Sequence, residues 1–140
     1  MKEKFIIIAM YTKDTPYEQE RERLIKTLDI INVRRHLYQI PNLGSWAKNG
    51  QQNASIILRA MEEYKDCNIV FVDADAEIKT YPVLFDDYKY DMALYPMCYN
   101  EERKTHSKIK ITNYLTGTMF WRNNDKCKEL LKEWAELNNS

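Results

Sequence analysis

The stretch Asn68-Ile69-Val70-Phe71-Val72-Asp73-Ala74-Asp75 is the segment from which the fold of this chain can be predicted. Four consecutive apolar residues, 69–72, form a continuous run of the kind that is typical of a strand buried on both faces of a sheet. A similar run occupies residues 5–9. Because such strands occur mainly in sheets that helices cover on both sides, we predict that 5–9 and 68–72 are neighbouring, parallel and buried strands.

Helical and extended patterns alternate around these two runs. Thr15 can cap a helix that presents Leu24, Leu28 and Ile31 on one face. The alternation predicts an α/β fold, a three-layer α/β/α sandwich with a mainly parallel sheet, in a single domain over residues 1–140. The other predicted elements are strands at 36–40, 92–95 and 114–121, helices at 51–64, 83–88 and 125–138 (the last with Leu130, Leu131, Trp134 and Leu137 inward), and a mobile loop at 98–110.

The composition narrows the class of protein. Apolar residues make up 44% of the chain, enough for a hydrophobic core, and 21 basic residues balance 21 acidic ones, which argues against a nucleic-acid-binding surface. No apolar run approaches the ~18 residues of a membrane span. The apolar run after Lys4 lacks a signal-peptide cleavage site, and the cysteines form no Cys-x-x-Cys pair. We therefore expect a cytoplasmic protein with reduced thiols, no membrane span and no nucleic-acid partner.

Asp73 and Asp75 carry the clearest chemical signal. Ligands of parallel α/β sheets bind beyond the carboxyl ends of the strands, which here are the polar segments 11–14, 42–49 and 73–77. Two carboxylates so close together repel one another unless a cation neutralises them, and oxygen ligands suit Mg²⁺ or Mn²⁺. A divalent ion there would bridge a nucleotide diphosphate and stabilise its charge as it leaves. In the alternative interpretation, the two aspartates only cap the turn after the strand.

Several segments resemble glycosyltransferases of the GT-A fold and the nucleotide-diphospho-sugar transferase family. Ile69-Val-Phe-Val-Asp-Ala-Asp-Ala-Glu-Ile78, followed by Pro82, is similar to their Asp-x-Asp segment. Tyr11-Thr-Lys-Asp-Thr-Pro-Tyr-Glu18 resembles the first strand-to-helix turn of the family. Gly44-Ser-Trp46 and Leu115-Thr-Gly-Thr-Met-Phe-Trp121 resemble later segments, the second of which lines the sugar pocket. The matches cover most of the chain and occur in the same order.

This resemblance implies a metal-dependent, hexosyltransferase-like enzyme that transfers a sugar from a nucleotide-diphosphate donor, a UDP-sugar in the first instance, to an unknown acceptor. Mn²⁺ or Mg²⁺ would be the cofactor, and the loop at 98–110 would close over the bound donor. By the resemblance, the turn at Tyr11-Thr12 would hold the base. The residues implied to bind the donor are Tyr11, Thr12, Lys48, Asp73, Thr116, Gly117 and Thr118, and those implied to bind the metal are Asp73 and Asp75.

The chain departs from the family in two places. Many relatives carry a basic residue at the start of the second helix to meet the phosphates, whereas here the segment is Gln51-Gln52-Asn53 and the nearest cation is Lys48. The sequence ends at Ser140, and the distal region that supplies acceptor contacts and often a catalytic base has no counterpart. The catalytic residue is therefore unknown, and weak transfer with slow donor hydrolysis is expected. The alternative function is a non-catalytic nucleotide-sugar-binding domain, or a truncated remnant that needs a partner.

Overall fold

A computed structural model describes residues 4–100 and 110–139 of the chain. The five strands lie in one sheet in the order β2-β1-β3-β5-β4. Of the helices in the described ranges, none is both long and apolar enough to cross a bilayer. In chain order the elements are β1 (Phe5–Thr12), α1 (Tyr17–Ile31), β2 (Arg35–Ile40), α2 (Trp46–Gly50), α3 (Asn53–Glu63), β3 (Asn68–Val72), a 3₁₀ turn (Val83–Phe85), β4 (Met92–Asn100), β5 (Lys110–Trp121) and α5 (Asp125–Asn138).

The sheet is mixed. β1 pairs in parallel with β2 and with β3, and Ile7 lies opposite Val70 in the second of these pairs. Each residue of 5–9 is 2% exposed or less, so the predicted pair of neighbouring, parallel, buried strands is confirmed. The prediction of a mainly parallel sheet is wrong, because β3 pairs antiparallel with β5 and β5 pairs antiparallel with β4. Only residues 101–109 separate β4 from β5, fewer than the roughly dozen residues of a crossover between parallel neighbours, so these two strands pair antiparallel.

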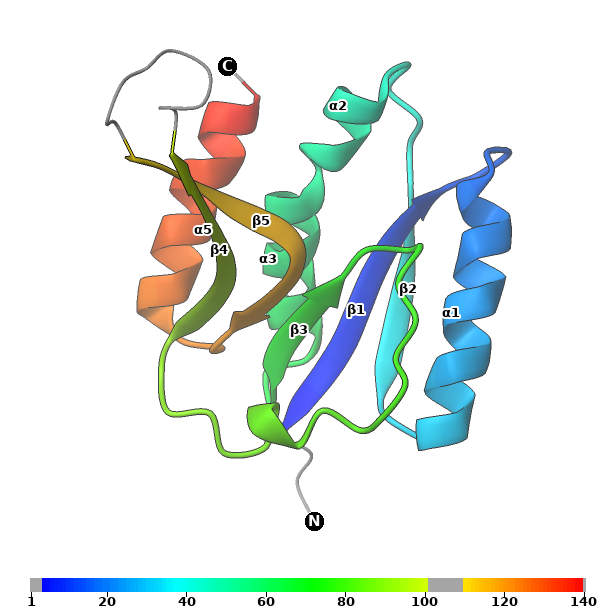
Figure 1. Cartoon of the computed structure of the whole chain (residues 1–140), viewed down its shortest axis with the longest axis horizontal. Coiled ribbons are helices and arrows are strands. Elements are labelled where there is room, and N and C mark those ends of the chain that lie inside the picture. Colours follow the sequence, from blue (N-terminus) through cyan, green and yellow to red (C-terminus); the bar gives the residue numbers. More distant parts are fainter. Residues whose placement is uncertain (1–3, 101–109, 140) are drawn as a thin grey trace.

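Helices pack on both faces of the sheet (Figure 1). Successive side chains of a strand point to opposite faces, so Ile6 and Ile8 of β1 pack against α3 and α5, whereas Ile7 packs against Leu24 and Leu28 of α1. The prediction of an α/β fold is therefore confirmed. In Figure 1 the carboxyl ends of the three parallel strands lie at the upper end of the molecule, together with α2 and the end of α5.

The boundaries of several predicted elements differ from the observed ones. Of the helix predicted at 83–88, only the 3₁₀ turn Val83–Phe85 forms. The helix predicted at 51–64 begins later, because α3 starts at Asn53, and a separate helix that was not predicted, α2, precedes it. Ser45 caps α2 by accepting a 3.2 Å hydrogen bond from the backbone N–H of Lys48. The strands predicted at 92–95 and 114–121 are longer, since β4 continues to Asn100 and β5 begins at Lys110. The predicted loop is shortened accordingly, and the rest of it, 101–109, lies outside the described residues.

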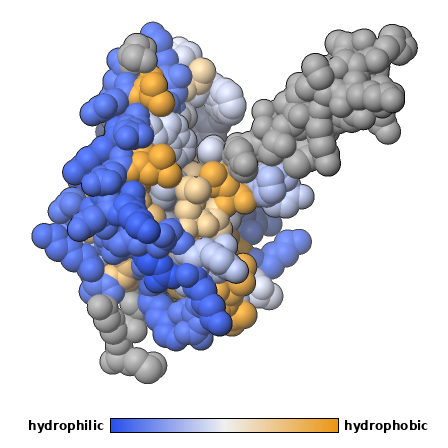
Figure 2. Space-filling view, turned by 90° about the vertical axis from the view of Figure 1, so that its left-hand side faces the viewer, coloured by the Kyte–Doolittle hydropathy of each residue, from blue (hydrophilic) through white to orange (hydrophobic). Residues whose placement is uncertain are grey.

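The predicted inward face of α5 is partly wrong. Leu131 is buried and Trp134 packs on the core, but Leu130 is 46% exposed and Leu137 is 73% exposed. Cys127 takes the place of Leu130, because residues four apart lie on one side of a helix and Cys127 and Leu131 therefore share the face that meets the sheet. Figure 2 views this side of the molecule, where apolar groups reach the surface between hydrophilic ones.

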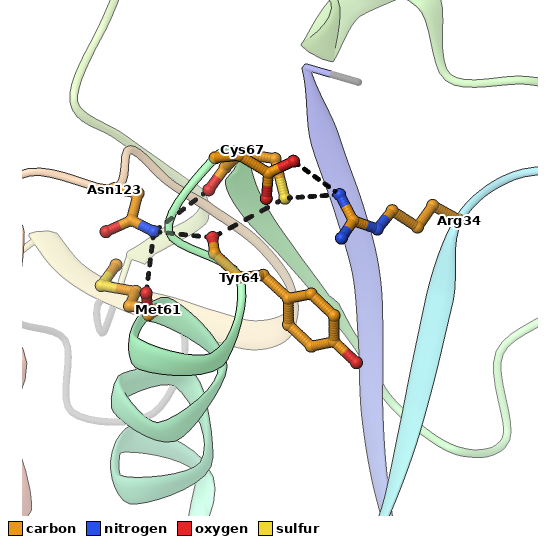
Figure 3. Close-up of polar contacts among 6 residues, drawn as sticks. Arg34, Met61, Tyr64, Cys67 and Asn123 are labelled. Atoms are coloured by element: carbon orange, nitrogen blue, oxygen red, sulfur yellow. Dashed lines mark hydrogen bonds and ion pairs between the residues drawn. The ribbon is translucent and has the colours of Figure 1, made fainter. Parts of the chain in front are cut away.

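Asn123 joins the start of α5 to the end of α3 (Figure 3). Its side-chain amide lies 3.1, 3.0 and 3.2 Å from the backbone carbonyl oxygens of Met61, Tyr64 and Cys67, to which it donates, and its backbone N–H donates to the Asn68 side chain at 2.9 Å. Carbonyls at the end of a helix have no partner within the helix. The Asn123 amide satisfies these carbonyl groups and holds the start of α5 beside the end of α3.

Candidate functional site

A cavity of about 460 Å³ opens at the carboxyl ends of β1, β2 and β3. This is the edge at which α/β sheets bind ligands and at which the sequence predicts a site. The strand ends form part of its wall, and the rest comes from Thr116 of β5 and from α2, α3 and α5. The cavity is therefore built from segments that lie far apart in the sequence.

Five of the predicted site residues line this cavity together. Tyr11 and Thr12 come from the end of β1, Asp73 and Asp75 follow β3, and Thr116 lies in β5. β1 is the direct neighbour of β3, and β3 is the direct neighbour of β5, so the order of the strands brings these segments side by side. Gly117 lies directly beside the Asp73 carboxyl group and supports it from β5.

Two predicted residues lie outside the lining of the cavity. Lys48 is exposed on α2, and its neighbours Ala47 and Asn49 face the cavity in its place. Thr118 is exposed and lies opposite Val72 in the sheet, one position beyond Gly117. In the described part of the chain, no lysine, arginine or histidine contributes to the cavity wall.

Asp73 is positioned by backbone contacts on both sides. Its N–H donates to the carbonyl of Gly117 at 3.0 Å, which continues the β3–β5 pairing, and its own carbonyl accepts from Ala76 at 3.0 Å, which closes the turn. A Cβ atom at position 117 would lie 2.9 Å from Oδ2 of Asp73 and 3.6 Å from its Cγ. Such an atom would be too close to the carboxyl oxygen, so the observed position of Asp73 requires glycine at 117.

The negative charge of Asp75 disfavours the ionised form of the neighbouring Asp73 carboxyl group. Burial of the carboxyl group against its surroundings raises the pKa of Asp73, and the negative charge of Asp75 raises it further. The residue as a whole is solvent-accessible, so the shift reflects the local position of the carboxyl group at the cavity wall. Among the described residues, no side-chain hydrogen bond links either aspartate to the backbone of the turn. The turn-capping interpretation therefore lacks the contact that it requires.

The pair has the donor chemistry for a divalent cation but is not a complete metal site. Oxygen ligands with net negative charge suit Mg²⁺ or Mn²⁺. However, the described residues contain no group of three or more histidine, cysteine, aspartate or glutamate side chains that could hold a metal ion. An ion that needs about six ligands would take at most a few from Asp73 and Asp75 and the remainder from water and a bound ligand.

The pKa of Asp73 gives an expected dependence of stability on pH. A carboxyl group whose pKa is higher in the folded than in the unfolded protein contributes stability below its unfolded pKa, and this contribution is lost as the pH rises through the folded pKa. Asp73→Asn removes the titration, so with a chelator present the variant should melt at a higher temperature than the wild type at pH 7. Melting curves recorded between pH 7 and pH 4 should show this gain in melting temperature decreasing as the pH falls toward the ordinary carboxyl pKa of about 4. A gain that is constant with pH would contradict the assignment.

The turn after β1 is held by threonine hydroxyl groups. The buried Thr12 and its neighbour Thr15 have their hydroxyl oxygens 2.7 Å apart, and the Thr15 hydroxyl donates to the Thr12 carbonyl at 2.8 Å. Asp14 adopts a left-handed conformation (φ 60°) within this turn. The Arg21 guanidinium lies 4.8 Å from the centre of the Tyr11 ring, a cation–π contact that orients the ring at the mouth of the cavity.

Sequence reasoning found only part of the side of the cavity that the helices form: Trp46 lies within the predicted segment 42–49, whereas Asn53, Trp134 and Asn138 were missed. All four line the cavity, and the Asn138 amide donates to the carbonyl of Gln51 at 2.9 Å, which links the end of α5 to the start of α3. Trp46 is 80% exposed, and a tryptophan in a polar segment was a usable signal. Nothing in the sequence marks the other three, because their position depends on how α5 packs beside α3.

Comparisons with known proteins identify the fold. No family model and no curated protein matches the sequence. Among 13 matching chains of solved structures is a glycosyltransferase involved in the glycosylation of the major capsid of PBCV-1. It superimposes with a TM-score of 0.65 at 16% identity, over 98% of this chain and 68% of that one. At this identity the likeness shows a glycosyltransferase-like fold.

Proposed function

We propose that this chain is a glycosyltransferase of the GT-A type, with a three-layer fold, that binds a nucleotide-diphosphate sugar in the cavity and depends on a divalent metal. The observation that carries the proposal is that Asp73 and Asp75 both face the cavity at the ligand-binding edge of the sheet. Among the described residues, no positively charged side chain lines this cavity. A diphosphate cannot approach two uncompensated carboxylates without a cation, so a metal is required for the donor to bind.

The residues present fit a division of tasks around the donor. Asp73 and Asp75 would hold Mn²⁺ or Mg²⁺, which when bound offsets the charge that develops on the leaving diphosphate. Gly117 keeps the Asp73 carboxyl in place, and Tyr11, oriented by Arg21, offers an aromatic surface to the base. The expected roles of Thr116 and Thr118 toward the sugar and of Lys48 toward the phosphates belong to the same proposal.

A second candidate function is nucleotide-sugar binding without transfer. One observation favours it: in the described part of the cavity wall the only side chains that could act as a general base near neutral pH are Asp73 and Asp75, which the metal would occupy. Base catalysis typically contributes about 10²- to 10⁴-fold, so its absence would leave slow turnover. The two candidates share the same donor site and differ only in chemistry.

Thermal shift with a panel of nucleotide diphosphates, each with and without Mn²⁺, tests the proposal. A ligand at 100 times its dissociation constant stabilises a protein by about 2.7 kcal/mol, which moves the melting temperature of a domain of this size measurably. We expect a shift that needs both nucleotide and Mn²⁺. The absence of a shift with every nucleotide would refute donor binding. Donor hydrolysis, measured with and without candidate acceptors, then separates transfer from binding alone.

A further inference from the structure

Asn53 holds a polar group in the cavity that the protein does not use. It is the first residue of α3 and is only 7% exposed, yet it lines the cavity. Its side-chain oxygen accepts a hydrogen bond from the backbone of Ala54 at 2.8 Å, which fixes the orientation of the amide. Within the described ranges, the amide nitrogen donates to no protein group. A donor in this position is available to a ligand, and leaving it unpaired when a ligand excludes water is costly.

The cavity that Asn53 lines also has apolar and aromatic side chains in its wall, next to the polar ones. Met10, Ile40, Phe71 and Trp134 line the cavity, and all four belong to or pack against the core between the sheet and helices α3 and α5. A hydrogen-bond donor held in a fixed orientation beside apolar side chains is typical of a site that determines the orientation of a flat ligand group. A charged phosphate would have no cationic partner there, so the part of a nucleotide that suits this wall is its base.

We propose that Asn53 determines which nucleobase the site accepts, by donating a hydrogen bond from its amide nitrogen to the carbonyl oxygen at ring position 4 of uracil. Uracil and cytosine are the decisive pair, because uracil has a carbonyl group at ring position 4 and a hydrogen on N3, whereas cytosine has an amino group at position 4 and no hydrogen on N3. Uracil offers an acceptor to the amide, whereas cytosine places a second donor against it. This inference rests on the proposed function. Asn53 lines the same cavity as Tyr11 and Thr12, the residues expected to hold the base.

The test compares UDP and CDP by titration calorimetry in the presence of Mn²⁺. The wild type should bind UDP about ten- to a hundredfold more tightly than CDP, the range expected when a buried donor loses its partner. Asn53→Asp keeps the acceptor for Ala54 but replaces the donor, so it should abolish or reverse this preference. Aspartate is favourable in the first turn of a helix, so the variant should fold. The melting temperature of the variant checks this. Asn53→Ser, which adds no charge, should also lose the preference.

Gln51→Glu is the matched control. Gln51 lies at the same cavity and is exposed, so the variant adds the same charge without removing the Asn53 donor. It should weaken the binding of UDP and of CDP by the same factor and leave the ratio of their dissociation constants unchanged. Equal binding of UDP and CDP to the wild type would overturn the inference, as would an Asn53→Asp variant that weakens both nucleotides equally, because that result indicates a phosphate contact. If neither nucleotide binds with Mn²⁺, the proposed function itself fails and the inference is overturned with it.

Discussion

Asp75→Asn is expected to abolish the metal-dependent part of nucleotide-diphosphate binding while leaving the fold intact. Asp75 is exposed at the cavity and accepts no hydrogen bond from the described residues, so the nearly isosteric amide disturbs no protein contact. The metal and the diphosphate should bind with positive and reciprocal coupling of about 1–3 kcal/mol, because each completes the surroundings of the other. Removing one carboxylate should therefore lower the affinity for UDP in Mn²⁺ by about 5- to 150-fold.

Titration calorimetry on the wild type and Asp75→Asn, each with Mn²⁺ and with a chelator, measures this coupling directly. In the wild type, the chelator should remove most of the affinity, because the described cavity wall carries two acidic and no basic side chains. In Asp75→Asn, the two conditions should give nearly the same weak binding. The same nucleotide affinity in all four experiments would show that the aspartate pair is not a metal site, and the glycosyltransferase proposal would lose its chemical basis.

Gly117→Ala is expected to impair the same site from the opposite side. The added Cβ would lie 2.9 Å from the Asp73 carboxylate oxygen, so the short side chain of Asp73 must turn away or the strands must separate. Because Asp73 is exposed, we expect its carboxyl group to turn away at little cost in stability. A displacement of about 1 Å of a group that positions substrate can cost about 10²-fold in activity. We therefore expect metal-dependent nucleotide affinity to fall toward that of Asp75→Asn, with little change in the melting temperature.

Gly50→Ala provides the matched control for this substitution. Gly50 also lines the cavity, but a Cβ atom at this position would meet nothing within 4 Å. Because alanine is the better helix former, the control should be neutral or slightly more stable and should keep its metal-dependent binding. If both variants bind nucleotide and metal as the wild type does, the close approach of β5 to Asp73 has no role in the site.

The elements that the sequence predicted well are those that a local pattern specifies. Continuous apolar runs identified the central strands β1 and β3, and the spacing of apolar residues in the last helix located α5 at its observed bounds, Asp125–Asn138. The inward face of that helix was less predictable, since Leu130 and Cys127 both suit an apolar face and only the packing against the sheet distinguishes them. The second half of the sheet was predicted incorrectly because the pairing of β5 with β3 joins residues distant in the sequence.

By itself, the sequence determined that a buried strand delivers Asp73 and Asp75 to the ligand-binding edge of an α/β sheet, because burial and strand direction follow from local composition. Only the tertiary structure decided what surrounds that pair. Antiparallel β5 places Gly117 against Asp73. The hydrogen bonds of Asn123 hold α5 beside α3, and the described cavity wall therefore contains amide groups and aromatic rings but no cationic side chain. Such surroundings depend on contacts between segments far apart in the chain, and no local pattern of residues encodes them.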